Sequence, residues 1–70
     1  MSNIRLTFGK RLRKLREKKG ISQEVLAYDA ELDRTYISSV ERGKRNISLE
    51  NIEKLSVALD VKIQSFFADE

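Results

Sequence analysis

The sequence predicts an all-α fold, in which residues 1–70 form one domain of five helices. Three observations predict it. The chain has no Pro and only three Gly, its turn signals are short, and its apolar residues recur at the helical spacing of three and four. A chain of 70 residues is too short to divide into two domains, and its 40% apolar fraction supports one small core.

The first two helices are predicted over residues 4–19 and 23–30. The apolar face of the first consists of Phe8, Leu12 and Leu15. Gly20 ends this helix, because glycine readily adopts the left-handed conformation that terminates helices. Ser22 can cap the second helix. Its apolar face consists of Val25, Leu26 and Ala30.

The third helix is predicted over residues 34–42, between the cap residue Asp33 and Gly43. Its apolar stripe consists of Ile37, Val40 and Tyr36. A fourth helix follows the cap residue Ser48, with one face formed by Leu49, Ile52, Leu55, Ala58 and Leu59. A short fifth helix around residues 63–67 closes the chain.

The second and third helices form the informative motif, because each is too short to be stable alone in water. Ala27 is small enough to let two helices cross closely, and Ile37 and Val40 can fill the angle between them. This pattern is typical of a helix-turn-helix and places one at about residues 23–42. A generic three-helix packing unit produces a similar pattern and stays open as an alternative.

The charge is distributed unevenly along the chain. The net charge is +3, but residues 1–21 hold eight Lys and Arg against one Glu, whereas residues 46–70 hold two Lys against five acidic residues. A basic front and an acidic back indicate a polyanionic partner on one side. The alternative is an ordinary solvated face on the first helix.

Two segments carry a family resemblance. The segments LREKKGISQEVLA and LDRTYISSVERGKRNISLENIEKLSVAL resemble the phage repressor and Cro-like (XRE-type) helix-turn-helix family, and the resemblance extends from about Phe8 to Phe67. Within that family, DRTYISSVERGKRNISLENIEKL is most similar to the controller proteins of restriction-modification systems, which are homodimeric regulators of the endonuclease gene and of their own gene. The resemblance implies a compact five-helix domain like that of lambda repressor.

The resemblance also implies that the third helix enters the major groove of DNA. Arg34 can place two donors on the O6 and N7 atoms of guanine, and Thr35 offers a hydroxyl and a methyl group to a base edge. Tyr36 can contact the backbone or a base step, although a buried ring is the alternative. The candidate base-reading residues are Arg34, Thr35, Tyr36, Ser38 and Ser39.

Phosphate contacts are expected at both ends of the third helix. Gln23 begins the second helix, where the family hydrogen-bonds the DNA backbone and where a helix N-terminus favours an anion. The candidates on the other side follow the third helix and are Arg42, Lys44, Arg45 and Asn46. The alternative for this second group is a solvated basic turn.

Two structural features follow from comparison with the family. The resemblance implies that Arg16 and Glu41 form an ion pair that fixes the first helix against the third. The turn carries Glu31 where the family has Gly, and a Glu at positive φ would be strained there.

A dimer interface is expected in the C-terminal region, at about residues 57–67. This region is more apolar than a monomer of this size can bury, and a single recognition helix reads too few base pairs for useful selection. The candidate interface residues are Val57, Val61, Ile63, Phe66 and Phe67. The alternative is that both Phe side chains belong to the monomer core.

The composition excludes several function classes. The chain has no Cys and no His, which removes thiol and imidazole catalysis and the usual zinc ligands, so we expect no enzyme activity, no metal and no cofactor. Its uncharged runs are far shorter than the about 18 apolar residues that a membrane span needs, and no apolar signal core is seen at its N-terminus. We therefore expect a cytoplasmic protein without a membrane partner.

The expected function is sequence-specific DNA binding and transcription regulation, by a homodimer on a palindromic operator, as in a restriction-modification controller protein. Two dimers on adjacent sites and RNA polymerase are further candidate partners. The alternatives are a phage-like repressor, an antitoxin subunit whose main partner is a protein, and nonspecific binding of RNA or another polyanion by the first helix.

Overall fold

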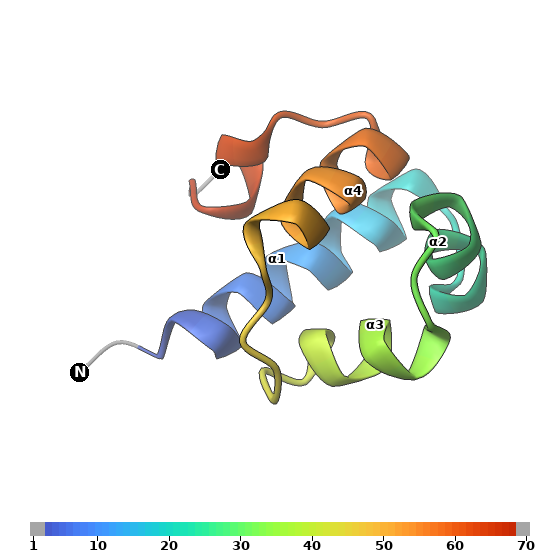
Figure 1. Cartoon of the computed structure of the whole chain (residues 1–70). Coiled ribbons are helices and arrows are strands. Elements are labelled where there is room, and N and C mark those ends of the chain that lie inside the picture. Colours follow the sequence, from blue (N-terminus) through green and yellow to red (C-terminus); the bar gives the residue numbers. More distant parts are fainter. Residues whose placement is uncertain (1–2, 69–70) are drawn as a thin grey trace.

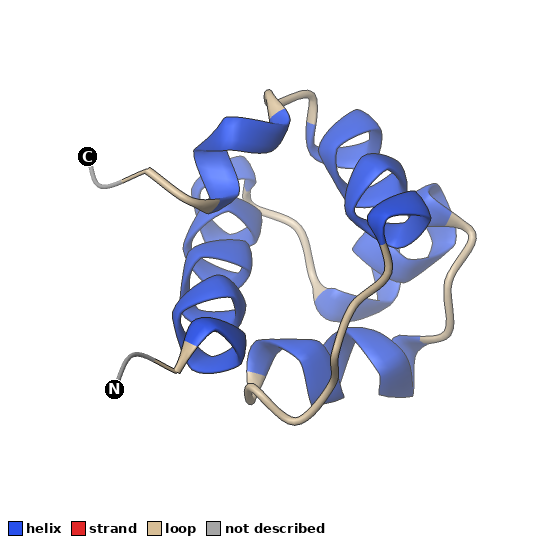
Figure 2. Cartoon of the chain, turned by 60° about the vertical axis from the view of Figure 1, so that its left-hand side comes forward, coloured by secondary structure: helices blue, strands red, loops and turns tan. Residues whose placement is uncertain are grey.

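The computed structural model describes residues 3–68, and the regular elements in this range are all helical (Figures 1 and 2). They are α1 (Ile4–Lys19), α2 (Gln23–Ala30), α3 (Arg34–Glu41), α4 (Leu49–Leu59) and the 3-10 helix η1 (Ile63–Phe66). The all-α prediction is confirmed. The predicted count of five helices is not confirmed: the short element at the predicted position of the fifth helix is a single 3-10 turn, closed by i→i+3 hydrogen bonds from the Ser65 and Phe67 amides.

The long helix α1 crosses the molecule, and the other elements pack around it (Figure 1). Helix α3 lies along one side of α1, whereas α4 and η1 lie on the other side, and α2 packs against both α3 and α4. The segment between α3 and α4 is the longest connection between helices in the described range (Figure 2). This arrangement leaves the side of α3 that faces away from α1 and α2 open to solvent.

Each α-helix begins at a polar side chain that accepts a hydrogen bond from a backbone amide of the first turn. The predicted caps Ser22, Asp33 and Ser48 are confirmed, with oxygen–nitrogen distances of 3.1, 2.8 and 3.2 Å. Asn3 caps α1 in the same way, at 3.3 Å from the Leu6 amide. Gly20 ends α1 in the left-handed conformation, as predicted.

The core lies where the four α-helices and η1 meet. Its buried apolar residues are Phe8, Leu12, Leu26, Ala27, Ala30, Ile37, Val40, Ile52, Leu55, Leu59 and Phe66. Ala27, Ile37 and Val40 are thus buried at the crossing of α2 and α3, where the helix-turn-helix pattern placed them. Two apolar-face predictions are wrong: Leu49, the first residue of α4, is 81% exposed, and Val25 is 44% exposed although the next residue, Leu26, is fully buried.

The two C-terminal Phe residues have different environments. Phe66 is fully buried, and its ring centre lies 5.0 Å from that of Phe8. Phe66 therefore belongs to the monomer core, and its predicted place in a dimer interface is wrong. The neighbouring Phe67 ring also contacts Phe8, at 5.6 Å between centres, but remains exposed. The 3-10 turn separates the two rings so that one closes the core and the other lies at its edge.

Two glycines allow the backbones of α1 and the end of α3 to meet. A Cβ atom on Gly9 would lie 2.4 Å from the Val40 carbonyl oxygen and 2.7 Å from that of Glu41. A Cβ atom on Gly43 would lie 2.6 Å from the Leu6 Cδ2 atom. Carbon atoms are not accommodated at such distances, so α3 is held against α1 by direct backbone contact. Gly9 lies inside a helix, and the sequence analysis assigned it no role.

The turn between α2 and α3 contains the strained residue that the sequence indicated. Glu31 has φ 57° and ψ 42°, the left-handed conformation, and the next amide, that of Leu32, donates to the Ala27 carbonyl at 2.8 Å. Asp60 ends α4 with a similar φ of 55°. Aspartate tolerates this conformation better than glutamate, because its short polar side chain can bond locally.

We predict that Glu31→Gly raises the free energy of unfolding by about 1 kcal/mol, because glycine adopts positive φ without the steric cost that a Cβ atom imposes. For a domain of this size, the melting temperature should rise by about 4–8 °C. Asp60→Gly is the matched control, and its gain should be smaller. Thermal and urea unfolding measure both variants, and a loss of stability in Glu31→Gly would contradict the strain at this turn.

Candidate nucleic-acid interface

The outer face of α3 is the central feature of the candidate site. Ile37, Val40 and Glu41 fix the inner face, and the residues four positions apart on the opposite side point away from the core. This outer face carries Arg34, Thr35, Ser38, Ser39 and, just beyond the helix, Arg42. Four of the five candidate base-reading residues therefore share one face. Arg34 and Thr35, at the helix start, are exposed, and Ser38 and Ser39 are half-buried.

The first turn of α3 is ordered by its cap. Both the amide and the hydroxyl of Thr35 donate to the Asp33 carboxylate, at 2.8 and 2.5 Å. These two hydrogen bonds lower the pKa of the Asp33 carboxyl, with the side-chain bond the larger cause. The capping contribution is thus present above the ordinary pKa of aspartate and is lost as the pH falls through the lowered value. The Thr35 hydroxyl donates its proton to this cap, so its oxygen lone pairs and its methyl group remain for a contact with a base edge.

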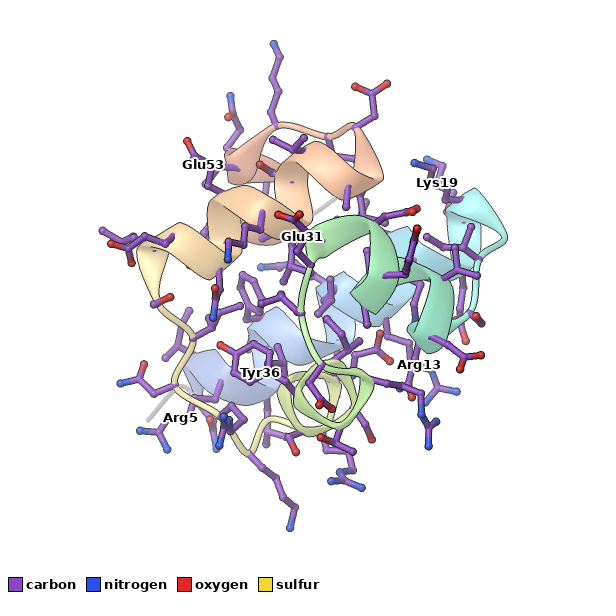
Figure 3. The ribbon with its side chains drawn as sticks, turned by 45° about the vertical axis from the view of Figure 1, so that its right-hand side comes forward. Arg5, Arg13, Lys19, Glu31, Tyr36 and Glu53 are labelled. Carbon is purple, nitrogen blue, oxygen red and sulfur yellow. The ribbon has the colours of Figure 1, made fainter. Side chains whose placement is uncertain are left out.

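Tyr36 differs from its neighbours because it connects α3 to the chain that follows. Its ring packs against the core, and its hydroxyl accepts a hydrogen bond from the Asn51 amide group at 3.0 Å. The Arg45 guanidinium lies 4.8 Å from the ring centre, which is a cation–π distance. Figure 3 shows Tyr36 between α3 and the segment that enters α4. Half-buried, Tyr36 positions the loop that follows α3, a role that the sequence analysis did not foresee.

The segment after α3 carries the second group of candidates. All four of these side chains are exposed, and they directly follow the outer face of α3 in the chain: Arg42, Lys44, Arg45 and Asn46. Gly43 turns the chain there with φ 74°, and its contact with Leu6 fixes the turn against α1. The site therefore has cationic side chains beside the C-terminal end of α3, as a DNA-binding surface requires.

A buried polar network anchors the C-terminal end of α3 through its last residue, Glu41. The Arg16 Nε atom donates to Glu41 Oε2 at 2.7 Å and its Nη2 atom to Oε1 at 3.1 Å, so the pair is bidentate. The two side chains are 12% and 4% exposed. The hydrogen bond to Glu41 raises the pKa of Arg16, against the opposing effect of burial. The ion pair implied by the family resemblance is present.

Gln23 belongs to this network. Its Nε2 atom donates to Glu41 Oε1 at 3.0 Å. The carboxylate of Glu41, the last residue of α3, therefore accepts hydrogen bonds from both α1 and the first residue of α2. Arg16 also donates to the Ile21 carbonyl at 2.9 Å, ahead of α2. The phosphate contact predicted for Gln23 stays a prediction; in the structure its side chain orients α2 relative to α3.

Residues 3–68 show neither a metal-binding cluster nor a membrane-spanning helix. Within this range no group of three or more acidic side chains is arranged to hold a metal ion. No helix of the described chain is both long enough and apolar enough to cross a bilayer. The exposed face of α3 and the cations beside it remain the strongest candidate site.

The comparisons with known proteins agree with this geometry. The helix-turn-helix family model matches residues 12–66, which include all of α2 and α3. The chain belongs to the helix-turn-helix family. Within this family, it is 50% identical to control protein C.MunI of a Mycoplasma species over 70 residues, covering 99% of this chain and 95% of that protein. It is 56% identical to control protein C.BamHI of Bacillus amyloliquefaciens over 62 residues, covering 87% of this chain and 76% of that protein.

A solved structure of a controller protein is similar to this chain in both fold and sequence. The restriction-modification controller protein C.AhdI from Aeromonas hydrophila superposes with a TM-score of 0.87 at 55% identity, covering 89% of this chain and 94% of that chain. This helix-turn-helix protein thus belongs among the restriction-modification controller proteins. The fold is common to this chain and to C.AhdI.

We predict that Glu41→Ala lowers the free energy of unfolding by about 3–5 kcal/mol, because it leaves the half-buried Arg16 and Gln23 without their shared acceptor. Glu24→Ala, which removes an exposed carboxylate from α2, is the matched control and should have a much smaller effect. Thermal unfolding of both variants under the same conditions measures the difference. Equal shifts in melting temperature would show that the network does not stabilise the fold.

Proposed function

We propose that this protein is a sequence-specific DNA-binding transcription regulator, the controller protein of a restriction-modification system, acting on the endonuclease gene and on its own gene. The observation that carries the proposal is the outer face of α3. The face is polar and exposed at Arg34 and Thr35, is followed by Arg42, Lys44 and Arg45, and is held in place by buried contacts with α1. The similarity to controller proteins over nearly the whole chain supports the same function.

In this proposal α3 enters the major groove with its N-terminal end toward the bases. Arg34 reads guanine through two hydrogen bonds, a contact that discriminates against other bases by about 1–3 kcal/mol. Thr35, Ser38 and Ser39 approach neighbouring base edges, and Tyr36 contacts the adjacent backbone or a flexible step. Arg42, Lys44, Arg45, Asn46 and the N-terminus of α2 at Gln23 contact phosphates and fix the register.

The functional unit in this proposal is a homodimer on an inverted repeat. An apolar patch formed by Leu49, Ile63 and Phe67 lies around one groove, and these side chains are 81%, 43% and 46% exposed. Burying such a patch against its symmetric copy stabilises a dimer. Leu49 thus replaces Phe66 in the predicted interface. Val57 remains exposed on α4, and Val61 is half-buried against the core.

The acidic rim of this patch favours the same assembly. Glu50 and Glu53 line the groove beside the apolar side chains, so this surface repels DNA, whereas the α3 surface attracts it. The dimer would therefore place both recognition helices on DNA with Glu50 and Glu53 away from it. Binding of two dimers at adjacent sites and contact with RNA polymerase are extensions of the proposal for promoter control.

The direct test selects bound duplexes from a random DNA library at physiological salt, with the wild-type protein and with Arg34→Ala. We predict an inverted repeat whose half-sites contain a preferred guanine, and we predict that Arg34→Ala loses preference at that position alone. An enriched motif that Arg34→Ala leaves unchanged would contradict the reading role of α3.

Ile63→Asp serves as the companion variant for the dimer. It places a charge within the exposed apolar patch and leaves α3 intact, so the variant should sediment as a monomer and bind the selected repeat far more weakly. A variant that stays dimeric and binds as tightly as wild type would place the interface elsewhere.

A further inference from the structure

The first turn of α1 lies outside the helix-turn-helix motif but packs directly on the loop that follows α3. A Cβ atom on Gly43 would lie 2.9 Å from the Leu6 Cα atom, so the backbones of α1 and the loop are in contact. Asn3 caps this turn through the Leu6 amide. The position of the first turn relative to the loop is therefore fixed by backbone contacts and not by a flexible tether.

This contact places Arg5 beside the candidate phosphate-binding residues. Arg5, Arg45 and Asn46 line one cavity, whose apolar wall includes Ile4, Ile47 and Phe67. Figure 3 shows Arg5 on the side of the molecule where the chain passes from α3 to α4. The charged end of α1 thus continues the cationic loop beyond the residues that the sequence pattern identified.

Arg45 links the two ends of this surface. Its guanidinium lies over the Tyr36 ring, and it lines a second cavity with Thr35 and Ser39 of α3. Arg45 therefore stands between the reading face of α3 on one side and Arg5 on the other. Across this surface, the outer face of α3 comes first, Arg45 lies next to it, and Arg5 lies beyond Arg45.

Three other cations of α1 have partners within the chain. Arg16 is paired with Glu41, and Arg13 is paired with Glu17 at 3.1 Å. Lys19 donates to the Ala58 carbonyl at 2.7 Å, at the opposite end of α1 from Arg5 (Figure 3). Arg5 is exposed, and within the range 3–68 it makes no ion pair.

We propose that Arg5 contacts a DNA backbone phosphate next to the one held by Arg45, and so extends the DNA-binding surface of the helix-turn-helix onto α1. The inference rests on the proposed DNA-binding function and deepens it. A backbone phosphate is the anion that the surface favours, because phosphates border the major groove on both sides of an inserted recognition helix. A guanidinium binds phosphate through two parallel hydrogen bonds and carries no sequence preference there.

The test measures the affinity of Arg5→Ala for a duplex carrying the selected repeat and for an unrelated duplex of equal length, between 50 and 200 mM salt. Each phosphate contact contributes about 0.9 to the slope of log affinity against log salt, so the two Arg5 residues of a dimer contribute about 1.8. Across this fourfold range, wild type should lose about 12-fold more affinity than Arg5→Ala. The variant should weaken binding to both duplexes by similar factors, and Arg5→Lys should restore most of the slope.

Lys18→Ala is the matched control. It removes the same charge from the same helix, about 20 Å from Arg5 at 1.5 Å per residue, beside Leu59 and Val61 on the far side of the molecule. Its salt slope should equal that of wild type. If Arg5→Ala shows the wild-type slope, or if Lys18→Ala lowers the slope equally, the contact is overturned while the proposed function stands. If wild type binds neither duplex, both the proposed function and the contact fail.

Discussion

The close approach of α1 to the end of α3 is the constraint on which the site depends. Gly9 has no side chain, and the space a Cβ atom would fill is occupied by the Val40 and Glu41 carbonyl oxygens. The same stretch of α1 supplies Arg16, whose bidentate bond to Glu41 crosses from one helix to the other. Backbone contact sets the separation of the helices, and the ion pair sets their rotation. A buried pair of this kind specifies geometry more than it adds stability, because desolvation offsets much of its attraction.

This fixed geometry produces the surface that we propose reads DNA. Helix α3 has eight residues and would not be stable alone, so its conformation comes from Ile37 and Val40 beneath it and from the caps at its ends. With its inner face so held, the outer face presents short polar side chains and Arg34 in a rigid array. Tyr36 and Arg45 then carry this order into the following loop. A reading element that is ordered before binding loses little conformational entropy on the DNA.

The sequence predicted the α-helical elements well, because their signals are local. Ser22, Asp33 and Ser48 mark helix starts, and Gly20 marks a helix end, through bonds within a few residues. Features that depend on contacts between distant parts of the chain were harder to predict from the sequence. Helical periodicity could not show that Leu49 projects beyond the core or that Phe66 and Phe67 separate, since both depend on how α4 and η1 meet α1. Gly9 gave no signal, because one glycine within a helix has many possible reasons, and Arg5 was only one of many cations until the loop packed against it.

The variant Gly9→Ala tests the central constraint most directly, through the free energy of unfolding and the affinity of the folded protein for its selected repeat. Alanine favours the interior of a helix over glycine by about 1 kcal/mol, so local propensity alone predicts a more stable protein. The close approach predicts the opposite. The free energy of unfolding should fall, and the molecules that still fold should bind the repeat more weakly, because α3 is displaced from α1. A Gly9→Ala protein that is more stable than wild type and binds the repeat with unchanged affinity would show that the α1–α3 contact does not position the reading helix.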